Sequence, residues 1–305
     1  MKYLINTLLF FFWRNRFGTR LKYHLNKTEF NFKPMNWSIK LYKSKGIFLK
    51  KQWSQLLHFG WFSRELDKFS GCADPFLFIH ESNIYLFFEA IVNNKGEIWA
   101  AEYNDGKLVS YNNIISEKFH LSYPFIFKYE EAFYMVPESH EDNSVRLYKS
   151  SNFPFTWKLD HLLIHDKTFA DTNLIISEGV FYWFTFDMGT NACRLYYVAS
   201  LKGEWIEHIK SPVGFCRNGG DFIYHDNYIL RPVQISKKSY GEGLKLMKIV
   251  VLSVEDYVEE EYINPFLEKR NGFSLNGTHH ISIANFKNNK LIAVDGRNLN
   301  FYKLV

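Results

Sequence analysis

A fivefold repeat constrains this chain more than any other feature of its sequence. An apolar run that begins at a polar residue recurs as DPFLF at 74, YPFIF at 123, DTNLI at 171, GDFIY at 220 and HHISI at 279. A second apolar run follows each copy after a polar turn, at 83–90, 132–139, 180–187, 227–234 and 290–297. Third runs follow at 97–103, 145–151, 194–200 and 244–250, and fourth strands are expected at 107–115, 157–164, 204–210 and 256–263. Five units of about four antiparallel strands predict an all-β fold, a five-bladed β-propeller.

The last unit ends near the C-terminus without a fourth strand. We expect the N-terminal segment WSIKLYKS at 37–44 to supply it, because this closes the ring and covers an exposed sheet edge. The aromatic content of 19% suits strands, since aromatic side chains pack well on pleated surfaces. Residues 36–305 are therefore predicted to form one propeller domain. The alternative is an all-β sandwich in which the similarity of the five copies is accidental.

The N-terminal arm, residues 1–35, differs from the rest in charge. Residues 1–51 hold 12 Lys and Arg against one acid, Glu29, which leaves 25 basic and 31 acidic side chains in the remainder. The acidic body argues against a nucleic-acid partner. Tyr3–Trp13 is too short to span a bilayer and has no cleavage site of small residues after it. We expect a cytoplasmic protein that lies on the anionic inner face of the membrane through residues 1–30, or else a first helix packed on the domain.

Polar side chains gather at one end of the predicted channel. The first strand of each blade lines the channel and the second runs back beside it, so the start of the first and the end of the second share one mouth. A polar ligand is expected to bind at this mouth. The positions concerned are Asp74, Glu89, Ser122, Tyr123, Glu138, Asp171, Asp187, Asn218, Asp221, Arg231, Gln234, His279, His280 and Asp295.

Three of these acids are candidate catalytic residues. Asp74 and Asp171 occupy the same repeat position in the first and third units, and Glu138 ends a second strand in VPES. Two carboxyl groups that converge on one axis can divide into an acid and a base, or a nucleophile and an acid. The alternative is structural: Asp74 and Asp171 cap turns or balance Arg231, and Glu138 is a solvated turn residue.

Other side chains at the mouth are candidates for substrate binding. Arg231, His279 and His280 supply donors for sugar hydroxyls or a phosphate. Because adjacent strand residues point to opposite faces, we expect no metal at the two histidines. The aromatic rings that could stack on a sugar are Tyr123, Trp183 and Tyr240. The sequence has no Gly-rich phosphate loop, nucleophile elbow or HExxH motif, and we expect no cofactor.

Several ordered motifs carry a family resemblance. They are CADPF at 72–76, HLSYPFIF at 120–127, VPES at 136–139, ADTNLI at 170–175, LRPVQ at 230–234 and NGTHHIS at 276–282. Between about residues 60 and 297 the chain resembles the propeller-type N-terminal domain of plant glucosamine inositolphosphorylceramide transferases and their bacterial relatives. It is more remotely similar to the five-bladed furanosidase clan of arabinanases, β-xylosidases and invertases.

The remote resemblance implies three acids around the channel, the first of them in blade one. Asp74 matches that first acid, whereas Asp171 stands where invertase-like enzymes have a glutamate and Tyr123 where an aspartate is usual. These departures argue against plain glycoside hydrolysis. In the plant proteins the recognised glycosyltransferase domain is a separate C-terminal one, so the family name carries no activity over to this chain.

The expected function is that of a carbohydrate-active protein in the biosynthesis of a cell-surface polysaccharide, either capsule or lipopolysaccharide. A glycosyltransferase-type site would use Asp74 as nucleophile or base and Glu138 or Asp171 as acid. Its partners would be a sugar donor or glycan acceptor and other glycan-assembly enzymes. The alternatives are a non-catalytic glycan-binding or scaffolding propeller and a glycoside hydrolase of the furanosidase type.

Overall fold

The computed structural model describes residues 37–48, 50–59, 69–104, 107–237, 239–268, 274 and 276–297. The arm predicted at residues 1–35 lies outside the described residues, and its attachment to a membrane surface stays a prediction. Among the residues that are described, no helix has the length and apolar character needed to cross a membrane.

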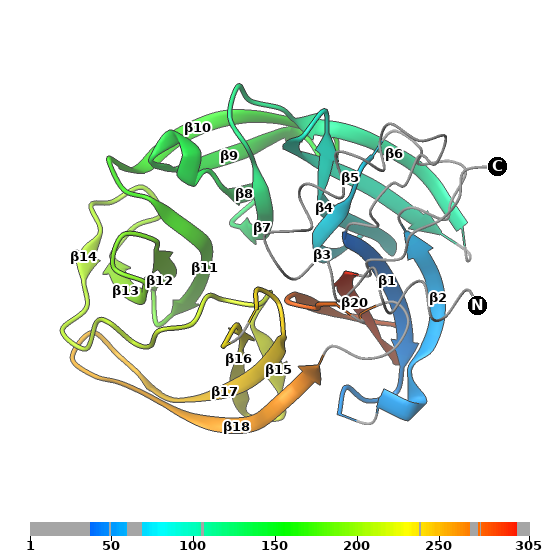
Figure 1. Cartoon of the computed structure of the whole chain (residues 1–305). Coiled ribbons are helices and arrows are strands. Elements are labelled where there is room, and N and C mark those ends of the chain that lie inside the picture. The colour runs from blue at the N-terminus through cyan, green and yellow to red at the C-terminus, as the bar shows by residue number, and fades with distance from the viewer. Residues whose placement is uncertain are drawn as a thin grey trace, which may run out of the picture.

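The described strands form five four-stranded antiparallel sheets that stand in a ring (Figure 1), which confirms the five-bladed propeller. Blade one contains β3 (Cys72–His80), β4 (Asn83–Val92), β5 (Lys95–Asn104) and β6 (Lys107–Ile115). Blade two contains β7 (Ser122–Tyr129), β8 (Ala132–Glu138), β9 (Ser144–Asn152) and β10 (Thr156–His165). Blade three contains β11 (Phe169–Ser177), β12 (Val180–Asp187), β13 (Ala192–Val198) and β14 (Ile206–Glu207). Blade four contains β15 (Ile223–His225), β16 (Tyr228–Ile235), β17 (Gly243–Leu252) and β18 (Tyr257–Glu268).

Blade five joins the two ends of the described chain. It contains β19 (Ile281–Phe286), β20 (Asn289–Arg297), β1 (Trp37–Ser44) and β2 (Ser54–Phe59), in that order. β1 pairs with β20 along its whole length, from Trp37 opposite Arg297 to Ser44 opposite Lys290, so the predicted closure is confirmed. The position of the closing strand differs from the prediction: β1 is the third strand of the blade, because the chain reverses after it and adds β2 as the fourth.

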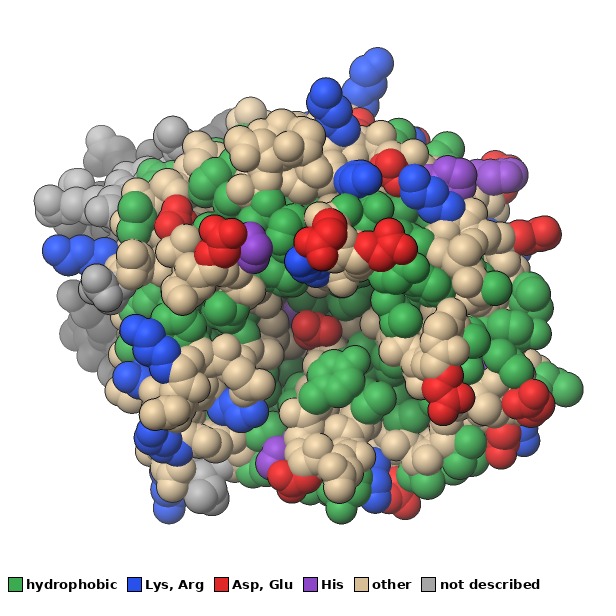
Figure 2. Space-filling view, turned by 180° about the vertical axis from the view of Figure 1, so that it is seen from behind, with side chains coloured by type: hydrophobic (Ala, Val, Ile, Leu, Met, Phe, Trp, Pro, Cys, Tyr) green, Lys and Arg blue, Asp and Glu red, His purple; other side chains and the backbone are tan. Residues whose placement is uncertain are grey.

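Large side chains fill the spaces between the blades. Trp183 of β12 is fully buried and stacks on Trp205, with ring centroids 4.9 Å apart. Trp183 therefore belongs to the core and does not reach the mouth, where the sequence had suggested a sugar-stacking ring. Seen from the side opposite to Figure 1, the molecule is hollowed near its centre, and an acidic side chain lies inside the hollow (Figure 2).

The first strands of blades one, two and three share a backbone irregularity at the channel mouth. Asp74, Tyr123 and Asp171 have φ values of 51°, 45° and 49°, the left-handed region that non-glycine residues rarely adopt. At each of them the pairing with the second strand shifts register, as in a β-bulge, which turns a side chain in a new direction. The bulge also explains why Pro75 and Pro124 follow two of these residues, since a residue outside the ladder needs no N–H to donate.

Candidate active site at the channel mouth

One pocket lies at the mouth and is lined by residues of blades one, two and five and of the segments that precede and join the strands of blade four. Its volume is about 270 Å³, and an aromatic wall faces a group of ionisable side chains. Of the residues predicted from the sequence, it is lined by Asp74, Glu89, Ser122, Glu138, Tyr240 and His279. The other lining residues are Trp37, Cys72, Ala73, Ile91, His120 and Arg217.

Asp74 is 5% exposed and held from three sides. The backbone N–H of Tyr123 donates to its Oδ2 at 3.2 Å, and ring nitrogens of His279 and His280 lie 3.5 and 3.4 Å from its Oδ1. Burial opposes ionisation, but the contact with His280 and the charge of His279 hold the pKa of Asp74 below its usual range. The expectation that adjacent histidines point apart is wrong here, because both precede β19 and lie outside the alternation of a strand.

Glu89, near the end of β4, forms a second buried pair with an imidazole. Its Oε1 lies 2.8 Å from Nε2 of His120. Burial, together with the charge of Asp74, raises the pKa of Glu89 against the opposing contact with His120. The same contact raises the pKa of His120. Because both pKa values move upward, this pair retains a proton more readily than either group would alone.

Glu138 and Asp171 share one guanidinium group. Nη2 of Arg217 lies 2.6 Å from Oε2 of Glu138 and 2.9 Å from Oδ1 of Asp171, and Nε lies 2.6 Å from Oδ2 of Asp171. Although burial opposes it, Arg217 lowers the pKa of Glu138 to about 2, with help from His140 at 2.7 Å. Burial raises the pKa of Asp171 despite Arg217, and the charge of Glu138 adds to the rise. The two carboxyl groups are thus driven apart in acidity, with Glu138 ionised, so Glu138 does not fit the role of an acid.

Three of the predicted residues support the site from beneath. The side chain of Gln234 donates to Oδ2 of Asp171 at 3.1 Å, and Asn218 donates to the backbone carbonyl of Asp171 at 2.7 Å. The hydroxyl of Tyr123 both donates to the carbonyl of Gly220 and accepts its N–H, each at 3.0 Å. These buried contacts fix the positions of Asp171 and of the backbone at the mouth rather than facing a ligand.

Three other predicted residues lie outside the pocket. Arg231 is 2% exposed and makes a bidentate contact with Glu259 of the outer strand β18, at 2.6 and 2.9 Å. Asp187 accepts hydrogen bonds from the turn that follows it. Asp221 accepts the N–H of Phe222, and burial raises its pKa to about 7. Contact of these three residues with a ligand stays a prediction.

Four side chains of the site were not predicted from the sequence. They are Trp37, His120, His140 and Arg217, of which the structure places Trp37, His120 and Arg217 in the pocket wall. His120, His140 and Arg217 each stand one or two positions along the chain from a predicted mouth residue. This proximity in the sequence is the one signal by which they could have been found. Trp37 is the first residue of the closing strand.

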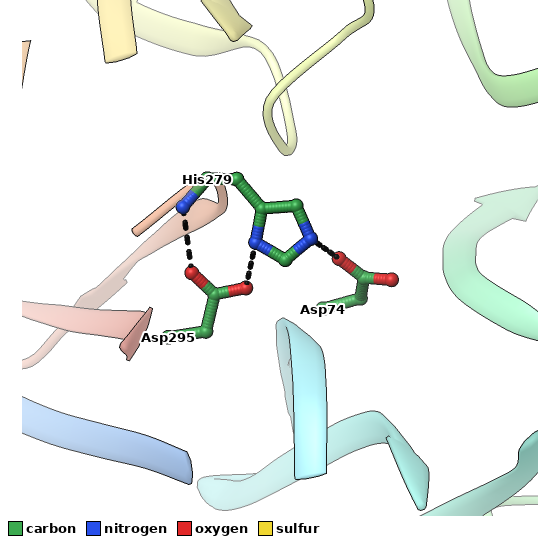
Figure 3. Close-up of side chains that lie close together, drawn as sticks. All are labelled: Asp74, His279 and Asp295. Carbon is green, nitrogen blue, oxygen red and sulfur yellow. Dashed lines mark hydrogen bonds and ion pairs between the residues drawn. The ribbon is translucent and has the colours of Figure 1, made fainter. Parts of the chain in front are cut away.

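Asp74, His279 and Asp295 are the described residues that come nearest to a metal site (Figure 3). Their ligand atoms all lie within 4.8 Å of one another. Oδ1 of Asp295 already accepts the backbone N–H groups of His279 and His280 at 2.9 and 3.1 Å, and its Oδ2 lies 2.6 Å from Nδ1 of His279. Only two ligand atoms remain, one on Asp74 and one on His279, so we assign no metal to this cluster.

Fold and site together define a class, the five-bladed propellers with a carboxyl-lined pocket at the channel mouth. The α-L-arabinofuranosidase PaAbf62A of Podospora anserina shares the fold with a TM-score of 0.58 at 9% identity, over 87% of this chain and 98% of that one. The catalytic domain of the Coprinopsis cinerea GH62 α-L-arabinofuranosidase does so with a TM-score of 0.57 at 9% identity, over 86% and 98%. At this identity the likeness concerns the fold alone.

The sequence identifies the family within this class. The family model "Glucosamine inositolphosphorylceramide transferase 1, N-terminal" matches residues 66–297. The glucosamine inositolphosphorylceramide transferases 1 of Oryza sativa subsp. japonica and Arabidopsis thaliana are each 33% identical to this chain, over 242 and 245 residues. The chain belongs to this family, which confirms the resemblance seen in the motifs. The match covers 73% of this chain but only 32% of each relative, so the chain spans about a third of their length.

Proposed function

We propose that this protein is a carbohydrate-active enzyme that transfers a sugar at the channel mouth during assembly of a cell-surface glycan. The observation that supports it best is one pocket whose wall includes Asp74 and Glu89, two carboxyl groups with opposite pKa shifts. The pKa of Asp74 is lowered by its contacts with His280 and His279, whereas burial raises the pKa of Glu89 and the contact with Glu89 raises that of His120. A base and a proton donor facing one cavity are what substitution at an anomeric carbon requires.

In this proposal Asp74 accepts the proton of the acceptor hydroxyl as the acceptor oxygen bonds to the anomeric carbon. The bond from that carbon to the leaving group breaks, and the departing oxygen takes a proton from the pair of Glu89 and His120. The assignment moves the acid from Glu138, which is ionised, and from Asp171, which lies beneath Arg217. Hydrolysis would follow the same course with water as the acceptor.

The rest of the pocket suits a sugar ring. Trp37 and Tyr240 form an aromatic wall with ring centroids 6.1 Å apart, and aromatic faces pack against the apolar faces of sugars. Arg217 and Ser122 add donors for hydroxyl groups or a phosphate. The volume of about 270 Å³ is below the range of roughly 300–1,000 Å³ typical of drug-sized ligands, which favours a single sugar unit.

The family name, which for the longer relatives names glucosamine and inositolphosphorylceramide, supports a carbohydrate partner. We infer a sugar donor or glycan acceptor for this chain, together with other enzymes of capsule or lipopolysaccharide assembly. A place on the inner face of the cytoplasmic membrane, reached through residues 1–30, belongs to the same proposal.

A glycan-binding or scaffolding propeller is the second candidate, and one observation favours it. Each acidic side chain that lines the pocket already contacts a cationic or imidazole group: Asp74 contacts His279, Glu89 contacts His120 and Glu138 contacts Arg217. A site whose charges are compensated at rest suits the binding of a neutral sugar without chemistry.

The variants Asp74→Asn and Glu89→Gln separate the two candidates, with Asp226→Asn as a control on a side chain that is 74% exposed. Release of nucleoside diphosphate from a panel of nucleotide sugars, and restoration of the glycan in a deletion strain, are measured on each. We expect both variants to fold and their rate of sugar transfer to fall by a factor of about 10²–10⁴, whereas the control keeps the rate of the wild type. Full restoration of the glycan by a folded Asp74→Asn protein would exclude the enzyme and leave the binding function.

A further inference from the structure

The imidazole of His279 lies between two carboxylates at the mouth (Figure 3). Oδ2 of Asp295 is 2.6 Å from Nδ1 of the ring, and Oδ1 of Asp74 is 3.5 Å from Nε2 on its opposite edge. Asp295 is itself fully buried and accepts two backbone N–H groups, those of His279 and His280. Because the two backbone N–H groups hold Oδ1 of Asp295, the position of its Oδ2 is fixed as well. The contact of Oδ2 with Nδ1 then sets the orientation of the ring.

The faces of the ring are fixed as well. Trp37 of the closing strand lies against it with ring centroids 4.1 Å apart, and Tyr240 meets it edge-on at 4.9 Å. This packing depends on Gly241, whose φ is +72° and where a Cβ would come within 2.8 Å of the Trp37 ring. His279 is 3% exposed, so the ring is enclosed by protein and shielded from solvent.

We propose that Asp295 and His279 act as positioning residues that hold Asp74 at the pocket as an ionised carboxylate. The inference rests on the proposed function only in the use made of Asp74, because the positions of the three side chains stand without it. A protonated His279 forms an ion pair with both acids at once, with Asp295 at its Nδ1 edge and with Asp74 at its Nε2 edge. Asp74 then has a fixed cation on Oδ1 and a backbone donor on Oδ2, and its ionised form is the stabilised one.

The charges around the trio agree with this arrangement. Burial lowers the pKa of His279, but Asp295 and Asp74 outweigh it and raise the pKa to about 9. The charge of Glu138 also acts on Asp74 and disfavours its ionisation, and the charge of Asp74 in turn raises the pKa of Glu89 and of Asp171. Without His279, burial and the charge of Glu138 would act on Asp74 with His280 as its remaining imidazole contact, and the pKa of Asp74 would rise.

The ionisation of Asp74 can be measured directly, without any substrate. The full chain is labelled with ¹³C at the aspartate carboxyl carbons, the Asp74 signal is assigned by its loss in Asp74→Asn, and its chemical shift is followed with pH. In His279→Gln we expect the titration midpoint of Asp74 to rise by roughly one to three pH units. Asp295→Asn should move it in the same direction, and His165→Gln, at a side chain that is 80% exposed, should not move it.

An unchanged midpoint in a folded His279→Gln protein would overturn the proposal. If His279→Gln does not fold by its melting curve, Asp295→Asn, which keeps the shape of the side chain, decides in the same way. The result is independent of the proposed enzyme activity. A raised midpoint together with full activity of Asp74→Asn would uphold the positioning role and dismiss the catalytic one.

Discussion

Replacing Arg217 by Met tests the electrostatics of the site most directly. The guanidinium lies between Glu138 and Asp171, whose side chains are 6% and 3% exposed, so the substitution leaves two buried carboxyl groups without their shared cation. The pKa of Glu138 falls from an ordinary 4.5 to about 2, with Arg217 the largest favourable influence. At 1.36 kcal/mol per pKa unit, this shift corresponds to about 3 kcal/mol of folding free energy. Breaking a buried pair by removing one partner typically costs a similar amount, about 3–5 kcal/mol.

The pH dependence of this loss has a definite sign. Because the folded pKa of Glu138 lies below its unfolded value, its contribution is fully present above about pH 4.5 and disappears as the pH falls through about 2. Urea unfolding of Arg217→Met should therefore give a large loss at pH 7, and a loss less than half as large near pH 3. Arg194→Met is a matched control, since Arg194 is 22% exposed against 21% for Arg217. Its nearest acid is the half-exposed Glu207 at 3.0 Å, and Asp187 lies farther away at 3.7 Å, so about 0–1 kcal/mol is expected. Equal losses for the two variants at pH 7, or a loss that does not change with pH, would refute the argument.

Two further predictions concern the channel. Burial raises the folded pKa of Asp221 to about 7, above its unfolded value, so the contribution of Asp221 to stability falls as the pH rises from about 4 to 7. In melting curves, Asp221→Asn should therefore be more stable than the wild type at pH 8 but not at pH 4. Gly220 has a φ of +125°, and a Cβ there would come within 1.8 Å of the carbonyl of Ile281, so Gly220→Ala should destabilise the protein strongly. Gly46→Ala, where nothing lies within 4 Å, serves as its control, and similar urea midpoints for the two would contradict the close approach.

The fold could be predicted because the repeat carries its own register. The repeat aligns Asp74 and Asp171 as the starts of first strands, and a ring of blades places both at one channel mouth. The structure brings them there through the same bulge. The order of strands in blade five was less accessible, because β1 and β2 come before the first copy of the repeat in the chain instead of after β20. A short strand outside the repeat carries no periodic signal.

The site was predicted less well than the fold, for a physical reason. The acids sit at strand ends, whose positions the repeat determines, whereas the cations that set their ionisation come from segments that differ from blade to blade. Arg217 precedes blade four and reaches Glu138 of blade two, a contact across the channel that no local pattern specifies. Arg231 illustrates the converse: its repeat position matches the mouth, but its side chain turns to Glu259 on the outer strand.

The candidate site lies at the seam where the propeller closes, and this links its chemistry to the folding of the ring. His279 and Asp295 belong to blade five, Asp74 belongs to blade one, and Trp37 comes from the strand β1 that closes blade five. The contact between His279 and Asp74 therefore forms only when the last blade meets the first. The contact of Trp37 with His279 likewise requires β1 to pair with β20. A chain that opens at the seam would lose the orientation of His279, and with it the ionised state of Asp74, while the other blades remain folded. The ionisation of Asp74 therefore depends on closure of the ring.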